Sequence, residues 1–282
     1  ENAGKGGRIE ILAPEIVVDG VVDASGTTGG GAVFIGGQYQ GGNSPVPTDW
    51  SANPALQRAS LSLDNPYATS PSVTAATTGS GDGTPTSSTS DQNSPLIPNR
   101  NLPTARTTTI GANAHIRADG LDEGDGGVIV AWSDDVTNAA GGFSARGGAR
   151  TGNGGLIEIS GMALLEFNAT VDTSATHGKF GTLLLDPTNI TIGLSPNING
   201  DATTGDDIAS ATDLNNSANY GAVTSYITAS QLTTLLNTTD VTLAATNDIT
   251  VASALAKTGV VDTTLTLNAG NNIGINAAIT SS

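Results

Sequence analysis

Residues 241–255 (VTLAATNDITVASAL) and residues 265–279 (LTLNAGNNIGINAAI) repeat one another at a fixed offset of 24 positions. At this offset apolar residues meet apolar residues: Val241 meets Leu265, Leu243 meets Leu267, Ile249 meets Ile273, Val251 meets Ile275 and Leu255 meets Ile279. Within each copy the apolar residues alternate with small or polar ones, which is the period of a strand with one buried face. A repeat of this kind is typical of a solenoid in which one copy forms one coil.

One such coil is too small to fold alone. It offers roughly six inward apolar side chains worth about 1.5–3 kcal/mol each. Ordering its backbone costs about 1–2 kcal/mol for each of its two dozen residues. The strands therefore need neighbours about 4.8 Å above and below them. Such stacking predicts a side-chain ladder of Asn247 over Asn271 at a corner, unless Asn247 is only a turn residue that tolerates left-handed backbone.

The same unit recurs along the chain with different residues. A Gly-Gly pair followed by alternating apolar residues begins it at residues 6–11, 30–35, 126–130 and 154–159, and Gly-Thr begins it at 181–185. Matching closing segments stand at residues 22–26, 116–120, 143–147 and 171–174. We therefore predict one all-β domain over residues 1–282, a parallel solenoid with about 24–28 residues per coil. The Gly-Gly pairs are predicted corners and not phosphate-binding loops, because strands follow them.

Residues 43–104 interrupt this pattern. They hold nine of the twelve prolines, and proline cannot donate to a strand ladder. We predict an inserted loop rich in Pro, Ser and Thr that leaves one coil near Gly42 and returns near Thr107. A binding role and a tolerated insertion without a role are equally open.

A second interruption covers residues 195–226, which are predicted to form an irregular loop. A short amphipathic helix is predicted over residues 228–237. Thr228 and Gln231 have the spacing of a capping box, and Leu232, Leu235 and Leu236 lie on one helical face. We expect this face to pack against the side of the solenoid, with binding to a partner as the alternative.

The composition excludes several classes of protein. The chain has no cysteine, so it has neither disulfides nor thiolate chemistry. A net charge of −16 with only 10 basic residues disfavours nucleic acids and anionic membranes as partners. No apolar stretch reaches about 18 residues, so none is predicted to be inserted in a membrane. The chain starts at Glu1 and ends inside the repeat pattern, so we expect a piece of a longer, processed protein.

Several motifs follow one another in an order typical of a known family. They are residues 36–42 (GGQYQGG), 126–134 (GGVIVAWSD), 143–148 (FSARGG), 154–161 (GGLIEISG) and 181–190 (GTLLLDPTNI). This series resembles the repeat region of filamentous-haemagglutinin-like exoproteins of Gram-negative bacteria, over most of the chain outside residues 43–104. The chain departs from that family in lacking an Asn-Pro-Asn-Gly secretion motif and in its long insertion.

The resemblance implies a right-handed parallel β-helix that is exported by an outer-membrane two-partner-secretion transporter. It also implies an extracellular place on the cell surface and a role as a fibre or adhesin. The partners would be a glycan or protein on a host or neighbouring cell, or further copies in a fibre. The expected function is therefore a structural rod without catalytic residues or cofactors. The alternatives are a carbohydrate-active β-helix enzyme and a polymerising filament subunit.

Residues that favour the enzyme are few. Asp134-Asp135 and His177-Gly178-Lys179 are superficially similar to the catalytic groups of pectin-degrading β-helices, but the Asn-Thr-Asp and Arg-Ile-Lys partners are missing. We predict a solvated turn at Asp134-Asp135. The two histidines, His115 and His177, are too far apart in sequence to suggest a zinc site.

The acidic segment 119–126 has carboxylates and glycines that suit Ca²⁺, although it fits neither an EF-hand nor a calcium repeat. A Ca²⁺ site and a segment without metal are both compatible with this sequence, and no residue is predicted as a metal ligand. Four Asn-x-Ser/Thr triplets are predicted to be unmodified, because chance produces them in an Asn- and Thr-rich chain; they begin at Asn168, Asn189, Asn215 and Asn237.

Overall fold

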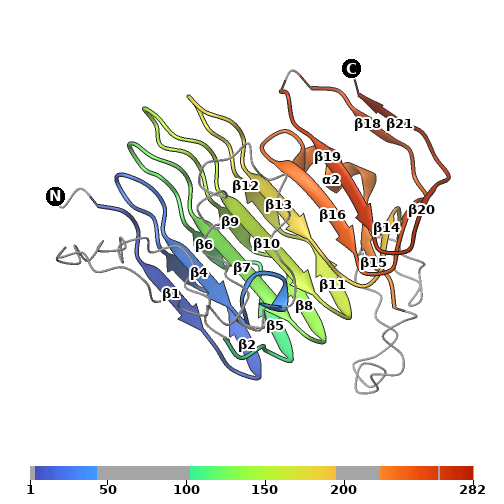
Figure 1. Ribbon diagram of the computed structural model, residues 1–282, viewed down its shortest axis with the longest axis horizontal. Helices are drawn as coiled ribbons and strands as arrows, with labels where there is room; N and C mark the ends of the chain where they lie inside the picture. Colours follow the sequence, from blue (N-terminus) through green and yellow to red (C-terminus); the bar gives the residue numbers. More distant parts are fainter. Residues whose placement is uncertain (1–3, 43–101, 195–222, 260, 282) are drawn as a thin grey trace, which may run out of the picture.

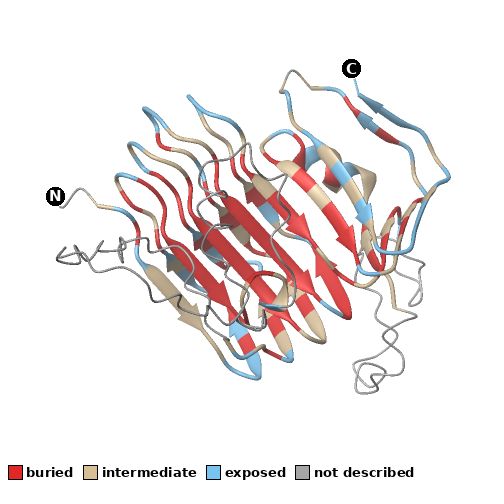
Figure 2. Cartoon of the chain, viewed as in Figure 1, coloured by how far each residue is buried: buried red, intermediate tan, exposed pale blue. Residues whose placement is uncertain are grey.

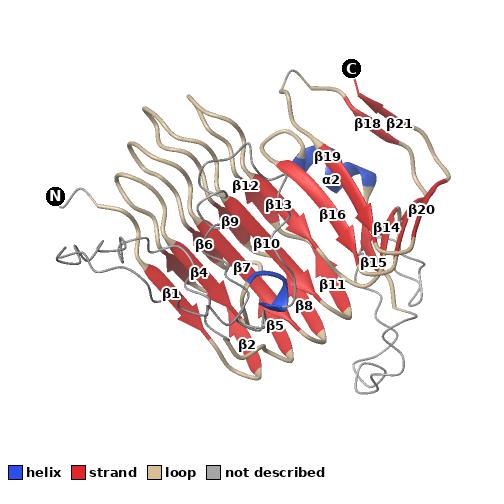
Figure 3. Ribbon diagram, in the orientation of Figure 1, coloured by secondary structure: helices blue, strands red, loops and turns tan. Residues whose placement is uncertain are grey.

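The structure is a computed structural model, and it describes residues 4–42, 102–194, 223–259 and 261–281. The described chain is mostly β-strand, and its strands lie parallel and side by side in several sheets (Figures 1 and 3). This confirms the predicted all-β parallel architecture. Most of the insertion predicted at 43–104 and most of the loop predicted at 195–226 lie outside the described residues, as does Asn215.

The first sheet runs through the whole described chain and takes every strand that follows a Gly-Gly or equivalent start. Its seven strands are, in spatial and sequence order, β1 (Arg8–Ile11), β4 (Ala32–Ile35), β7 (Val128–Ser133), β10 (Leu156–Gly161), β13 (Thr182–Leu185), β16 (Asp240–Ala245) and β19 (Leu265–Ala269). We call the stretch from one of these strands to the next a rung.

The later strands of each rung form the other sheets. The second sheet contains β2 (Glu15–Val18), β5 (Thr107–Ile110), β8 (Val136–Ala139) and β11 (Leu164–Phe167), and the third contains β3 (Val21–Asp23), β6 (His115–Arg117), β9 (Gly142–Ser144) and β12 (Thr170–Asp172). A fourth sheet contains β15 (Ser225–Ile227), β14 (Ile190–Ile192), β17 (Asp248–Val251) and β20 (Asn272–Ile275), and a fifth pairs β18 (Leu255–Lys257) with β21 (Ile279–Ser281). The return at Thr107, where β5 begins, agrees with the sequence prediction.

The 24-residue offset predicted from the sequence is the observed register. Val241 pairs with Leu265, Val251 with Ile275 and Leu255 with Ile279. At the intervening corner the backbone N–H of Asn271 donates to the carbonyl oxygen of Asn247 at 2.9 Å.

The predicted side-chain ladder of Asn247 over Asn271 is wrong. The Asn247 side chain donates to Asn189 Oδ1 in the preceding rung at 2.9 Å. The Asn271 side chain donates instead to Asp248 Oδ1 at 2.9 Å. A carboxylate is a stronger hydrogen-bond acceptor than an amide oxygen. Asn271 has the carboxylate of Asp248 within reach in the preceding rung, whereas Asn247 meets the amide of Asn189 in the rung before it.

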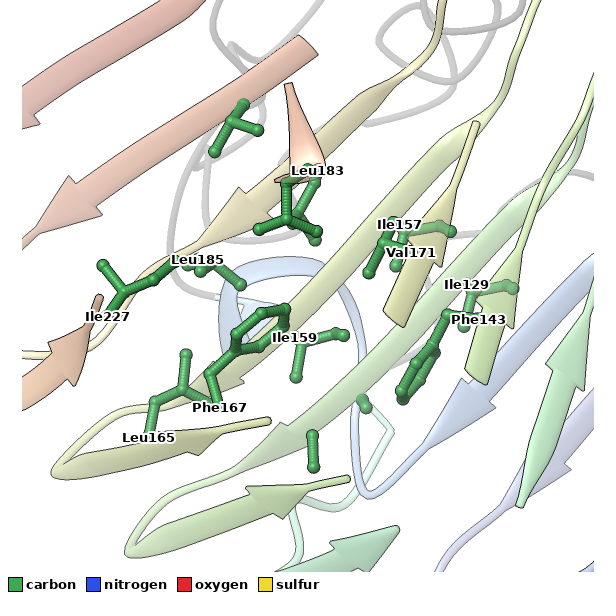
Figure 4. Packing of buried hydrophobic residues seen from close by; sticks show 14 of the residues in the cluster. Ile129, Phe143, Ile157, Ile159, Leu165, Phe167, Val171, Leu183, Leu185 and Ile227 are labelled. Atoms are coloured by element: carbon green, nitrogen blue, oxygen red, sulfur yellow. The ribbon is translucent and has the colours of Figure 1, made fainter. Parts of the chain in front are cut away.

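The main core lies between the sheets. Inward side chains of the first sheet, such as Ile157 and Ile159, meet Phe167 from the second sheet and Val171 from the third (Figure 4). Burial is concentrated in the central strands (Figure 2). In the last rung the side chains are more open, with Ile275 61% exposed.

Helix α2 (Ala229–Leu235) occupies the place of a strand, because it contacts both β12 and β18. Thr228 and Gln231 form the expected capping box. Leu232, Leu235 and Leu236 are buried in the main core. The helix therefore belongs to the wall of the fold and does not lie on its side, which corrects the sequence prediction. None of the helices in the described part of the chain has the length and apolar character of a membrane-spanning segment.

Strand β15 also corrects the prediction of a loop at residues 195–226, since residues 225 and 226 are already extended. Ser225 Oγ accepts a hydrogen bond from the backbone N–H of Leu165 in β11 at 2.9 Å. On its other edge β15 pairs with β14. Three residues are too few to show the alternation by which strands are recognised in a sequence.

Glycine is required where each rung begins. The backbone N–H groups of Gly31, Gly127, Gly155 and Gly181 donate at 2.7–2.8 Å to the carbonyl oxygens that close the preceding segment, those of Ala24, Ala118, Ala145 and Thr173. A Cβ atom on Gly127 would lie 2.0 Å from the carbonyl oxygen of Gly31. Rungs at strand spacing leave no room there for a side chain.

We expect Gly127→Ala to lower the free energy of unfolding by more than about 3 kcal/mol, because backbone must move to admit the methyl group. Gly7→Ala is the matched control: Gly7 precedes β1 as Gly127 precedes β7, but a Cβ atom there meets nothing within 4 Å. Urea unfolding measures both variants. Equal losses would show that the contact across rungs is not what requires glycine.

Val251→Asp is expected to unfold the neighbouring rungs at a cost of several kcal/mol, since Val251 is fully buried and a carboxylate there would have no partner. Ile275→Asp, at the paired position in the exposed last rung, is expected to cost less than about 1 kcal/mol. Circular dichroism during thermal unfolding compares them. A large loss for Ile275→Asp would contradict the observed difference in burial.

Candidate functional site

The acidic and basic residues singled out for enzyme activity are not brought together. Asp134 and Asp135 form the bend between β7 and β8 and are half-buried. Asp134 accepts hydrogen bonds from Trp132 Nε1 and from Thr104 Oγ1. His177 and Lys179 are exposed in the connection between β12 and β13, at a different corner. The predicted turn at Asp134-Asp135 is therefore present, although it is not fully solvated.

The acidic segment 119–126 spreads its carboxylates toward different partners. Asp119 is buried and accepts from the backbone N–H and the guanidinium of Arg146, at 2.8 and 2.9 Å. Asp122 and Glu123 pair with Arg150, and Asp125 accepts from Asn153. Arg146, Arg150 and Asn153 belong to the next rung. The segment therefore connects rungs. No group of three or more acidic, His or Cys side chains that could hold a metal ion is found in the described ranges.

The outer face of the first sheet carries a second buried cluster. Side chains alternate along β10. Ile157 and Ile159 point into the main core, so Glu158 and Ser160 point outward. Glu158 lies in register with Val130 of β7 and Leu184 of β13. The apolar members of this outer cluster are Ala32, Phe34, Tyr39, Val128, Val130, Trp132, Leu156, Leu184 and Ala244.

A tight turn at Tyr39–Gly42 is hydrogen-bonded to this face. The backbone N–H of Gln40 donates to both carboxyl oxygens of Glu158, at 3.0 and 2.9 Å, and Gln40 Nε2 donates to Asp186 Oδ2 at 3.2 Å. Gln40 adopts a left-handed φ of 48°. A Cβ atom on Gly41 would lie 2.6 Å from the Trp132 ring, so glycine lets the turn lie close against the indole.

We call Gln40, Glu158, Ser160 and Asp186 the outer carboxyl cluster. Burial raises the pKa of Glu158 well above its usual range; the hydrogen bond from Gln40 opposes this shift and the charge of Asp186 adds to it. Burial raises the pKa of Asp186 to about 6. No ion pair joins either carboxyl to a Lys or Arg within the described residues.

Burial also raises the pKa of the neighbouring Tyr39 phenol, with smaller contributions from the charges of Glu158 and Asp186. The phenol therefore stays protonated, and the site offers one neutral hydroxyl beside two carboxyls. Chemically, the cluster can hold a proton or a cation away from water.

Sequence reasoning missed this cluster for a clear reason. Strand alternation identifies Glu158 as an outward residue, and an outward carboxylate is ordinarily solvated. The signal that could have found it is the turn sequence at 36–42, where four glycines surround Gln38, Tyr39 and Gln40. Such a run predicts backbone lying unusually close to other groups.

Comparison with known proteins adds no assignment: no protein-family model matches the chain, and a search of curated proteins finds no match. The likeness to filamentous-haemagglutinin-like exoproteins therefore stays an interpretation of the sequence motifs.

The stability of the protein should fall as pH rises through the window set by Asp186. The folded state keeps a proton that the unfolded chain releases near pH 4, so the loss accumulates between about pH 4 and 6. A shift of about two pKa units corresponds to roughly 3 kcal/mol. Asp186→Asn should remove the part of this dependence that Asp186 contributes and leave the part that Glu158 contributes, because the pKa of Glu158 is raised as well.

The measurement is urea unfolding at a series of pH values with a chelator present. Asp122→Asn is the matched control, because the Asp122 side chain is 43% exposed, and it should keep the wild-type profile. An unchanged profile for Asp186→Asn would contradict the assignment.

Proposed function

We propose that this chain is a structural segment of a secreted bacterial surface fibre or adhesin, in which the stacked rungs form a right-handed parallel β-helix. The observation that carries the proposal is the first sheet, where seven successive rungs share strand edges. A strand edge that is paired above and below has no free backbone groups, so each rung depends on and stiffens the next.

The dimensions suit a spacer. At about 4.8 Å per strand, seven rungs cover roughly 30 Å along the stacking direction. Polar contacts between rungs support the corners, for instance Arg146 to Asp119 at 2.9 Å and Asn247 to Asn189 at 2.9 Å. Such a rod would supply reach and stiffness, and any recognition would come from loops displayed on it.

The further parts of this proposal follow from the motifs. The parent protein would leave the cell through an outer-membrane two-partner-secretion transporter and remain at the extracellular surface. Its partners would be glycans or proteins of a host or neighbouring cell, or further copies of itself in a fibre.

A carbohydrate-active enzyme is the second candidate, and one observation favours it. A hydrolase needs two carboxyls, one with a raised pKa, and Glu158 and Asp186 fit this description. Glu158 is, however, fully buried and hydrogen-bonded to backbone, so a sugar cannot reach it without displacement of the turn at Tyr39–Gly42. We therefore favour the rod.

Electron microscopy of the intact parent protein should show this segment as part of a thin, straight rod, and the purified chain coupled to beads should bind cells that display the ligand. Beads that carry Val251→Asp should lose binding, because the scaffold no longer holds its loops. Compact particles without a rod would contradict the proposal.

A parallel assay separates the alternatives. The chain is incubated with polyuronides and host glycans, and new reducing ends or unsaturated products are measured. Products that disappear in Glu158→Gln would establish the enzyme and overturn the rod as the primary function. Filaments formed by the purified chain alone would identify a polymerising subunit.

A further inference from the structure

We propose that the outer carboxyl cluster is a binding site for a hard divalent cation of the calcium type. The proposal concerns Gln40, Glu158, Ser160 and Asp186, and it is independent of the fibre function, since it would hold equally for an enzyme.

The cluster contains oxygens that lack regular hydrogen bonds. Ser160 is fully buried, and its Oγ atom makes no hydrogen bond of regular geometry to the described residues. The hydroxyl lies near the Glu158 carboxyl, two residues earlier on the same face of β10, where a loose contact with that carboxyl opposes the effect of burial on the pKa of Glu158. Gln40 Oε1 is likewise buried without a partner in the described chain. Buried polar atoms without regular hydrogen bonds destabilise a fold unless a ligand satisfies them.

The donor chemistry selects the ligand. Two carboxyls, one amide oxygen and one hydroxyl form a set made entirely of oxygen, which suits Ca²⁺ or Mg²⁺ and not the softer metals that prefer nitrogen or sulfur. Irregular placement on a strand, just beyond the end of the neighbouring strand and in a turn favours Ca²⁺, because Mg²⁺ demands near-octahedral geometry. The nearby Tyr39 phenol is not needed as a ligand.

The charge balance points the same way. Two neighbouring carboxyls are held in a buried place where no Lys or Arg of the described chain pairs with them. A proton can neutralise one of them, and a divalent cation would neutralise both.

The position of the site gives the cation a structural consequence. Gln40 follows β4, whereas Glu158 lies in β10 and Asp186 directly follows β13. A cation bound by all three would join the turn at Tyr39–Gly42 to two later rungs, the one that begins with β10 and the one that begins with β13. It would thereby fix the base of the connection between β4 and β5.

The experiment is terbium luminescence on the full 282-residue chain, stripped of metal with a chelator and measured at pH 7. Trp132, which lies against the same turn, should sensitise bound Tb³⁺, and Ca²⁺ should compete for the site. At about 100-fold excess over its Kd, Ca²⁺ should also raise the unfolding midpoint by a few degrees.

Variants locate the site. Glu158→Gln and Asp186→Asn keep shape and hydrogen-bonding capacity, and each should weaken Ca²⁺ binding at least tenfold while circular dichroism remains that of the wild type. Ser160→Ala should weaken it severalfold. Asp122→Asn, on the exposed acidic segment 119–126, is the matched control and should bind as the wild type does.

Two outcomes would overturn the proposal. Equal binding by the wild type and Glu158→Gln would show that Tb³⁺ and Ca²⁺ associate only with the acidic surface. No rise in the unfolding midpoint with Ca²⁺ at pH 7 would show that protons alone compensate the buried carboxyls.

Discussion

The strictest steric requirement of this fold is the close contact between a glycine at the start of one rung and the backbone of the rung before it. The N–H of Gly127 donates to Ala118, and its α-carbon lies where a side chain would overlap the Gly31 carbonyl. The same contact recurs at Gly155 and Gly181. The hydrogen bonds of the first sheet hold neighbouring strands about 4.8 Å apart, and at that spacing these positions leave no room for a side chain.

Much of this architecture can be predicted from the sequence because the repeat makes the same physical demand several times. Pairs such as Val251 and Ile275 are recognisable since both must occupy the same inward position in successive rungs. The repeat does not show how far each position is buried. Val251 and Ile275 are both hydrophobic, yet Val251 is fully buried and Ile275 is 61% exposed. Helix α2 is predictable from its cap and leucines, yet its place in the wall depends on which strands it separates, and a local pattern carries no such information.

The outer carboxyl cluster could not be predicted for a related reason. A strand's alternation tells which residues share a face, but it does not tell whether that face is covered. Here both faces of the first sheet are buried around β7 and β10. An outward Glu158 consequently meets Leu184, Val130 and the Gln40 backbone where a solvated carboxylate would be expected. Polar groups in so apolar a setting acquire unusual proton affinity.

The replacement of a strand by α2 divides the molecule in a way that the repeat conceals. A helix satisfies its own backbone and offers no edge, so the ladder of the third sheet ends at β12, and a separate pair, β18 and β21, takes its place. The second sheet likewise ends at β11, where β15 begins another. Of the ladders in the described chain, the first sheet alone crosses this boundary without a break. The two blocks of rungs thus share one continuous backbone ladder, the seam of β10 and β13, beside the common core and the contact of β15 with β11, and mechanical load or local melting can pass along that ladder from one block to the other.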